Sequence, residues 1–286
     1  MKSGFVALIG RSNVGKSTLL NTLVGTKISA TSFRPQMTRH IIHGALNSPE
    51  GQAIFVDTPG LLKERKSRLT ARLQHKVEEA LQEIDLIIYV VDPTRDIGAE
   101  ERSIFGMIRH LRIPKILVLN KSDLPKSERV YQQAYEAWAK DFDSMFLLSA
   151  LKARHIQPLK EKVFEFLKEG EPFYLDDQLT NIDNYFWIAE IIREKVFSVF
   201  DKELPYSMNV EIDNVEEKIK DKEMMTIIQG RILTNQDRFK KFIIGKNGNK
   251  IKEIGIMARR EIEASINRKV FLELEVEVDP HWVERI

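Results

Sequence analysis

The eight residues GRSNVGKS, from Gly10 to Ser17, constrain this chain more than any other feature of its sequence. They match the pattern G-x-x-x-x-G-K-[S/T], and they stand between the apolar run FVALI and a helical pattern that begins at Lys16. Glycines let such a turn bend around a phosphate, and the N–H groups at the helix start attract its charge. Lys16 adds a positive charge to the β- and γ-phosphates, and the Ser17 hydroxyl can ligate Mg²⁺. The sequence therefore predicts a nucleoside triphosphate site formed by Gly10, Arg11, Ser12, Asn13, Val14, Gly15, Lys16, Ser17 and Thr18.

Composition places the chain among globular proteins of about two domains. It has 286 residues, of which 43% are hydrophobic and 30% charged, and this excludes a disordered or fibrous chain. Cysteine is absent, which excludes a disulfide framework, a thiolate zinc site and a cysteine nucleophile. No apolar run approaches the ~20 residues that span a bilayer, and the opening MKSGFVALIG is typical of a strand, not of a signal peptide. A cytoplasmic location is expected.

The first 170 residues alternate short apolar runs with helical patterns, which predicts an α/β domain with crossover helices. Strands are expected at Phe5–Ile9, Ile41–Leu46, Ala53–Val56, Leu86–Val91, Ile116–Asn120 and Phe146–Ser149. Helices are expected at Lys16–Val24, Leu69–Glu83, Ala99–Leu111, Glu128–Lys140 and Ile156–Leu167. Residues 171–180 include a proline and several acidic residues without a clear period, so they are expected to link this domain, 1–170, to a second one, 181–286.

A second motif, DTPG, begins at Asp57, directly after the apolar run AIFV. A carboxylate at the end of such a strand is placed to hold Mg²⁺ through water. Gly60 offers a backbone N–H that can approach the γ-phosphate without a side chain in the way. The alternative is an Asx-type turn, which would be preferred if the loop at Gly10 were absent. The expected nucleotide contacts in this segment are Asp57, Thr58, Pro59, Gly60 and Leu61.

The third motif, Asn120-Lys121-Ser122-Asp123, follows the apolar run KILVL and bears on the choice of base. The Asp123 carboxylate can accept two hydrogen bonds from guanine, whereas adenine would leave it unpaired. Asn120 can brace neighbouring loops, and the stem of Lys121 can cover the base. After the sixth strand, backbone N–H groups could reach the guanine carbonyl from Ser149, Ala150 and Leu151. These motifs favour GTP over ATP.

The order of the motifs resembles that of small GTPases of the translation-factor-related class, in the group that includes Era. The resemblance implies a Ras-like P-loop fold with a six-stranded, mostly parallel sheet and helices on both faces. It also implies a switch threonine that ligates Mg²⁺ together with Ser17 and Asp57. Thr38 takes that role here, with Thr31 as its competitor. Asn13 matches an asparagine that coordinates K⁺ in several similar GTPases; a structural hydrogen bond is the alternative.

Leu61 stands where Ras-type enzymes have the glutamine that orients the attacking water. Leucine cannot form a hydrogen bond, so unaided GTP hydrolysis is expected to be slow. Backbone groups, a partner or a monovalent cation would then have to supply the help in catalysis that Leu61 cannot give. The residues expected to act in catalysis are Lys16, Thr38, Gly60 and Asn13.

The second half contains the loop Gly245-Lys246-Asn247-Gly248 between two helical patterns. A G-x-x-G loop between helices clamps the nucleic-acid backbone in KH domains, beside an apolar groove for unstacked bases. Residues 231–269 include eleven basic and four acidic side chains, a net charge of +7 in a chain whose total is +2. The alternative is a solvated helix pair with a glycine turn. The expected RNA contacts are Ile243, Ile244, Gly245, Lys246, Asn247, Gly248, Lys250, Lys252 and Arg259.

The elements expected in this half have the order α-β-β-α-α-β, with a leading helix at Asn184–Phe200 and strands at Ser207–Ile212, Met224–Ile232 and Val270–Val278. It also resembles the Era group, in AEIIREKVF, LPYSMNVEI and FIIGKNGNKIKEIGIMARREIE. The resemblance implies a type II KH domain in a GTP-driven switch that binds the 3′ end of small-subunit ribosomal RNA and assists assembly of the 30S subunit. It further implies a monomer that associates peripherally with the inner membrane and does not bind DNA. Glu275 and Glu277 replace a tryptophan and a lysine often found in the family, which makes the last strand acidic.

Two other classes of function stay open. One is an ATP-using motor or kinase that carries an RNA-binding domain, which base preference would distinguish. The other is a non-hydrolysing RNA-binding scaffold, suggested by Leu61, which phosphate release over many turnovers would distinguish.

Overall fold

The computed structural model describes residues 1–31, 40–58, 83–176, 178–200, 204–220 and 223–285. The chain forms two compact units, Met1–Asn181 and Ile182–Ile286. Four expected site residues, and nearly all of the expected helix Leu69–Glu83, lie outside the described residues. The four are Thr38, Pro59, Gly60 and Leu61.

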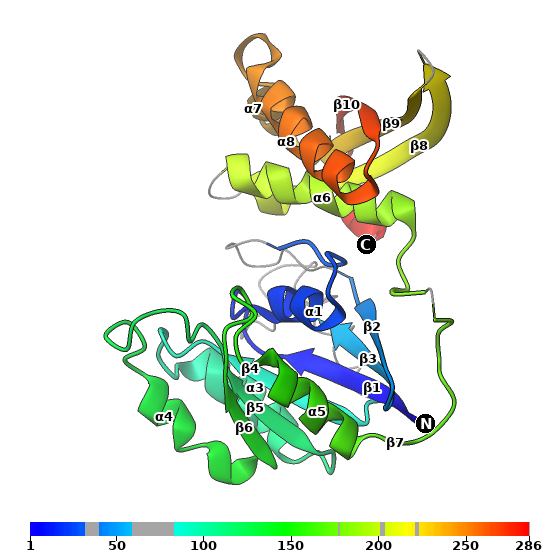
Figure 1. The fold of residues 1–286 in the computed structure, drawn as a ribbon. Coiled ribbons are helices and arrows are strands. Elements are labelled where there is room, and N and C mark those ends of the chain that lie inside the picture. The colour runs from blue at the N-terminus through cyan, green and yellow to red at the C-terminus, as the bar shows by residue number, and fades with distance from the viewer. Residues whose placement is uncertain (32–39, 59–82, 177, 201–203, 221–222, 286) are drawn as a thin grey trace. The chain divides into compact units, whose positions relative to one another are not determined.

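A mixed sheet runs through the first unit (Figure 1). Its strands follow the order β2-β3-β1-β4-β5-β6, and neighbours are parallel except for β2 with β3. A two-residue strand, β7, that the sequence does not predict pairs antiparallel with the start of β1. The strands are β1 (Lys2–Ile9), β2 (Ile42–Ser48), β3 (Gly51–Asp57), β4 (Leu86–Val91), β5 (Lys115–Leu119), β6 (Ser144–Leu147) and β7 (Lys168–Glu169).

The central strands of this sheet are buried along their length, because helices cover both of its faces. The helices are α1 (Lys16–Val24), α3 (Ala99–Arg109), α4 (Gln132–Glu136) and α5 (Ile156–Phe166). Helices α1 and α5 lie on one face, and α3 lies on the other, where Ile104 and Ile108 pack against Ile87 and Val91 (Figure 1). The carboxyl ends of β1, β3, β4 and β5 therefore meet at one edge, where ligands of open α/β sheets bind.

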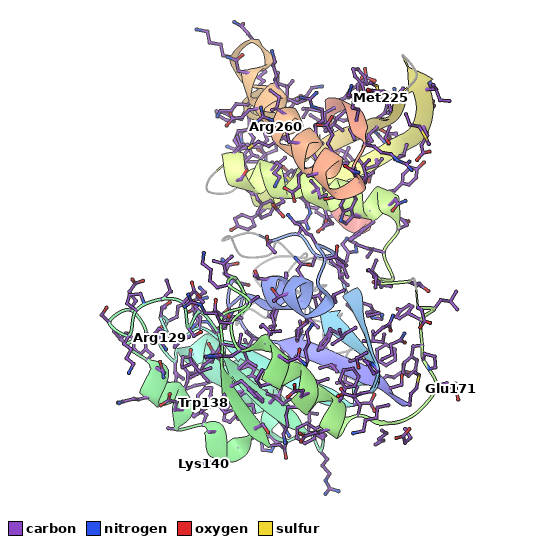
Figure 2. All side chains as sticks on the ribbon, viewed as in Figure 1. Arg129, Trp138, Lys140, Glu171, Met225 and Arg260 are labelled. Atoms are coloured by element: carbon purple, nitrogen blue, oxygen red, sulfur yellow. The ribbon has the colours of Figure 1, made fainter. Side chains whose placement is uncertain are left out.

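The segment Glu128–Lys140, expected to be one helix, contains only α4 and a short 3₁₀ turn at Ala139–Asp141. Trp138 donates its backbone N–H to Tyr135 and accepts from Asp141, so the chain winds more tightly than an α-helix here. This winding brings the Trp138 ring, labelled in Figure 2, onto Phe105 with ring centroids 4.4 Å apart. Aromatic packing against α3 thus replaces the expected helical continuation.

After β7 the chain is attached to the edge strand β2 and its neighbour β3. The side-chain amide of Gln52 accepts from the backbone N–H groups of Phe173 (2.7 Å) and Tyr174 (2.9 Å) and donates to the Tyr174 carbonyl. Further along, Ala45 donates its N–H to the Leu179 carbonyl at 2.9 Å. The segment expected to be a linker, 171–180, is thus hydrogen-bonded to the first unit near both of its ends.

The second unit has a three-stranded sheet in the order β10-β9-β8, in which β9 is antiparallel to β8 and parallel to β10. Its elements are α6 (Asn184–Val199), β8 (Met208–Lys220), β9 (Glu223–Thr234), α7 (Asp237–Ile244), α8 (Asn249–Ile266) and β10 (Lys269–Val278). The core includes Ile192 and Val196 of α6 and Ile254 and Ile262 of α8, all fully buried. The order α-β-β-α-α-β is the expected one.

Strand β8 is longer than the expected Ser207–Ile212. A register shift between Ile212 and Asn214 leaves Asp213 as a bulge, and pairing with β9 then continues to the end of the strand. The sequence does not reveal this extension because NVEEKIK lacks a clear alternation of apolar and polar residues. Among the described helices, none has the length and apolarity needed to cross a membrane.

Candidate nucleotide site and RNA-binding loop

The phosphate loop turns sharply between β1 and α1, and glycine is required at both of its limits. Gly15 has φ +99°, and a Cβ there would lie 2.2 Å from the side-chain nitrogen of Asn120. A Cβ on Gly10 would lie 2.3 Å from the carbonyl oxygen of Val90. Asn13 also has a left-handed backbone, with φ +65°. The loop is therefore closely packed against β4 and against the end of β5.

Lys16, the first residue of α1, is almost fully buried beneath this loop. Its ammonium group donates to the carbonyl oxygens of Gly10 at 3.1 Å and Arg11 at 3.0 Å. Burial lowers the pKa of Lys16, and the Coulombic attraction of Asp57 opposes that shift. The positive charge is thus held at the centre of the loop, close to where a phosphate would be bound.

A group of oxygen atoms next to Lys16 fits Mg²⁺. Asp57, fully buried at the end of β3, accepts from the Ser17 hydroxyl at 2.5 Å and from the Ser29 hydroxyl at 3.0 Å. Hydroxyl and carboxylate oxygens are the ligands that Mg²⁺ prefers, and this pair of motifs converges as expected. Ser29 was not predicted from the sequence. Thr58 points away, since its hydroxyl donates to the Leu8 carbonyl at 2.9 Å.

Asn120 joins the phosphate loop to the loops of the base site. Its side-chain N–H₂ donates to the Val14 carbonyl and its side-chain oxygen accepts from the Ala150 N–H, both at 2.9 Å. The Ser149 hydroxyl donates to Asp123 at 2.5 Å. The motifs expected to bind the two ends of a nucleotide are therefore connected by one buried side chain.

Two of the three backbone N–H groups in the triplet Ser149-Ala150-Leu151 already donate hydrogen bonds within the protein. The Ser149 N–H already donates to the Arg154 carbonyl, and the Ala150 N–H donates to Asn120. A guanine carbonyl would have to share these donors or use the N–H of Leu151, whose side chain is exposed.

Lys121 is held by Asp92, a residue outside the sequence motifs. Its ammonium lies 2.5 Å from the buried carboxylate of Asp92, which also accepts from the N–H and hydroxyl of Thr94. Asp92 directly follows β4, just as Asp57 ends β3, so its position at the end of an apolar strand could have marked it. The Asp92 contact fixes the Lys121 side chain beside the expected base site.

The loop GKNG joins α7 to α8 in the second unit and has a left-handed backbone at Gly245, Asn247 and Gly248, with φ of +72°, +52° and +75°. Lys246 and Asn247 are exposed, as are Lys252 and Arg259 on α8. Lys250 forms an ion pair with Glu253 at 2.8 Å. Exposed basic side chains thus lie both in the GKNG turn and on the helix that follows it, on which Figure 2 labels Arg260.

The two isoleucines expected to contact RNA differ in burial. Ile243 is fully buried, so its side chain belongs to the core of the second unit and has no surface for a base. Ile244 is partly buried. The neighbouring Phe242, which the sequence analysis did not single out, is 62% exposed on α7. The helical spacing explains the difference, since adjacent residues of a helix face different directions.

Known proteins resemble the chain over nearly its full length. A family model described as 50S ribosome-binding GTPase matches residues 5–121, and a KH domain model matches residues 203–283. GTPase Era of Caldanaerobacter subterraneus is 41% identical over 283 residues, which cover 98% of this chain and 94% of the relative. GTPase Era of Halothermothrix orenii is 40% identical over 284 residues, which cover 99% and 95%.

Two solved structures have the same fold throughout. One is Era in complex with MgGDPNP and nucleotides 1506–1542 of 16S ribosomal RNA, with a TM-score of 0.91 and 35% identity over 100% of this chain and 96% of that one. The other is a variant of Aquifex aeolicus Era bound to GDP and AlF₄⁻, with a TM-score of 0.91, 35% identity and the same coverage of 100% and 96%.

Proposed function

The chain belongs to the GTPase Era family, and on that basis we propose that it is a GTP-binding and GTP-hydrolysing switch that binds the 3′ end of small-subunit ribosomal RNA and assists assembly of the 30S subunit. The observation that carries the nucleotide part is Asn120, which connects the phosphate loop to the base loops. The RNA part is supported by the basic GKNG surface and by the related Era structure that contains 16S ribosomal RNA.

Guanine selection rests on Asp123. Its carboxylate, oriented by the Ser149 hydroxyl, accepts hydrogen bonds from the ring N–H and the exocyclic amine of guanine. Adenine has neither donor at these positions, so a bound adenine would leave the acceptor unpaired. This feature argues against an ATP-using motor or kinase.

Binding of the phosphates uses Lys16, Ser17 and Asp57. Lys16 would move its charge from the loop carbonyls to the β- and γ-phosphates. Ser17 and Thr38 would hold Mg²⁺ directly, and Asp57 would hold it through water. Mg²⁺, when bound, neutralises the charge that develops on the phosphate oxygens. Gly60 would donate its backbone N–H to the γ-phosphate, and loss of that phosphate would release the segments that carry Thr38 and Gly60.

Hydrolysis is slow without help, because Leu61 cannot orient the attacking water. Asn13, which has a left-handed backbone in the phosphate loop, would hold K⁺, and the charge of this ion would stabilise the negative charge that develops on the phosphate oxygens. Phosphate release over many turnovers should then be faster in potassium than in sodium at equal ionic strength. Complete absence of release, with RNA and 30S subunits present, would favour a non-hydrolysing scaffold.

The proposed cellular setting is the cytoplasm, with a monomer that associates peripherally with the inner membrane. The RNA role is tested by crosslinking the full-length chain to total cellular RNA, with either a non-hydrolysable GTP analogue or GDP bound, and sequencing the captured fragments. We expect fragments from the 3′ end of small-subunit ribosomal RNA, in amounts that differ between the two nucleotides. Fragments spread evenly over the transcriptome in both states would reject the proposal.

A further inference from the structure

A buried carboxylate, Glu101, lies on the α3 side of the sheet in the first turn of α3. The residue is 1% exposed and accepts hydrogen bonds from the hydroxyl of Tyr89 in β4 and, at 3.0 Å, from that of Tyr135 in α4. Both tyrosines are fully buried. Burial raises the pKa of Glu101, and hydrogen bonds from the two tyrosines and the charge of Arg11 oppose this shift. Two other elements, β4 and α4, thus hold the carboxylate of a residue in α3.

Arg11, the second residue of the phosphate loop, extends toward this carboxylate. One guanidinium nitrogen lies 3.5 Å from Glu101 and 3.1 Å from the carbonyl oxygen of Asp96. Its Nε donates to Glu100 at 2.8 Å. A planar guanidinium with acceptors on several sides is held in one orientation. The side chain of a loop residue is therefore attached to α3 and to the turn before it.

The next loop residue is held from the same side. Arg95, in the turn that precedes α3, donates to the carbonyl of Ser12 at 2.8 Å. Two consecutive residues of the phosphate loop thus depend on one neighbouring segment, which the sequence motifs do not include.

The main chain of Arg11 connects this anchor to the charge at the centre of the loop. Its carbonyl oxygen is one of the two that accept from the Lys16 ammonium. A displacement of Arg11 would move that carbonyl and the N–H groups beside it. Phosphate binding depends on positions within about 1 Å, so a small displacement would have a large effect.

We propose that Glu101 is a positioning residue for nucleotide binding: held by Tyr89 and Tyr135, its carboxylate keeps Arg11, and with it the phosphate loop, in the shape that binds the β-phosphate. This inference rests on the proposed guanine-nucleotide site. Because GDP and GTP share the β-phosphate, Glu101 acts on both to the same extent. A residue that only packed α3 against the sheet would change stability and leave nucleotide dissociation unchanged.

The test is the rate at which fluorescently labelled GDP dissociates from the full-length chain in Mg²⁺. Glu101→Gln keeps the shape of the side chain but removes its charge, and we expect about tenfold faster dissociation. A labelled non-hydrolysable GTP analogue should show the same factor. Arg11→Ala should have a similar effect. Since Glu101 acts through Arg11, the double variant should dissociate no faster than the faster of the two single variants.

A matched control comes from the second unit. Glu190 is also a buried carboxylate, and it forms an ion pair with the buried Arg193 in α6. Glu190→Gln should lower thermal stability but leave GDP dissociation unchanged. If Glu101→Gln does not fold, Tyr135→Phe removes one hydroxyl and retains the ring, and should accelerate dissociation about two- to threefold.

Dissociation within twofold of the wild-type rate in Glu101→Gln would overturn the proposal. If only Tyr135→Phe folds, a dissociation rate equal to that of the wild type would overturn it. A double variant whose acceleration is the product of the two single effects would also overturn it, because Glu101 would then act independently of Arg11. Failure of the wild-type chain to bind GDP is distinguishable from both, and would reject the nucleotide site itself together with this inference.

Discussion

The molecule contains two glycine-bounded turns that would meet phosphates, GRSNVGKS in the first unit and GKNG in the second, and their surroundings differ. In the first turn, a Cβ on Gly15 would lie 2.2 Å from Asn120, and the basic side chain, Lys16, is buried. In the second turn, a Cβ on Gly245 would lie 2.7 Å from the side chain of Lys250, but no atom lies within 4 Å of the position of a Cβ on Gly248. The basic side chain there, Lys246, is exposed.

The difference shows how a turn bounded by two glycines can bind two kinds of ligand. A closely packed turn with a buried charge is pre-organised, and it selects a small ligand whose phosphates have one geometry. An open turn with exposed charges can follow a flexible polymer and depends on long-range attraction. Shape should therefore determine most of the affinity at the first site, and charge should determine most of it at the second.

The largest effect is expected for Gly15→Ala. The added methyl group would displace Asn120, and φ of +99° is unfavourable for alanine, so GTP affinity should fall at least about 100-fold. Isothermal calorimetry would measure the affinity. RNA binding by the same variant serves as the control and should be unchanged. Wild-type GTP affinity in this variant would contradict a tightly packed loop.

Asp123→Asn should have the next largest effect. An amide cannot accept both guanine hydrogen bonds, so GTP affinity should fall about 100-fold or somewhat less, whereas xanthosine triphosphate should gain affinity. Competition against labelled GDP would give both values. Unchanged preference for GTP over xanthosine triphosphate would show that Asp123 does not contact the base.

The contribution of exposed charge to RNA binding by the second unit is tested by the double substitution Lys246→Gln and Lys252→Gln. Loss of two phosphate contacts should weaken RNA binding about tenfold at moderate salt and make the slope of log affinity against log salt shallower by roughly 1.4. The control is Lys126→Gln with Lys140→Gln, two exposed lysines of the first unit, which keeps the net charge equal. An equal loss in both variants would mean that only overall charge matters.

The smallest effect is expected for Gly248→Ala. Nothing obstructs a methyl group there, so only the unfavourable φ of +75° acts, and RNA affinity should fall about fivefold. Asparagine tolerates this conformation better, so Gly248→Asn should bind RNA more tightly than the alanine variant. If both variants lose affinity equally, the side chain itself blocks the RNA, and the second turn is less open than its surroundings indicate.

Much of the nucleotide site could be predicted because each motif is a short run at the end of a strand. Asp57 and Asn120 follow apolar runs, and parallel strands bring those ends together. Glu101, Tyr89 and Tyr135 could not be found in this way, because they belong to three elements that meet only in the folded chain. The burial of Ile243 was also missed, since one residue's position on a short helix decides it.

The attachment of Leu179 and Thr180 to β2 has a consequence for the solubility of the protein. Strand β2 is the last in its sheet, and an uncovered last strand can pair with the same strand of another molecule. The N–H of Ala45 is already donated to Leu179, and Gly44 forms an antiparallel bridge with Thr180. The chain's own connecting segment thus occupies positions at which intermolecular sheet growth, and hence aggregation, would otherwise begin.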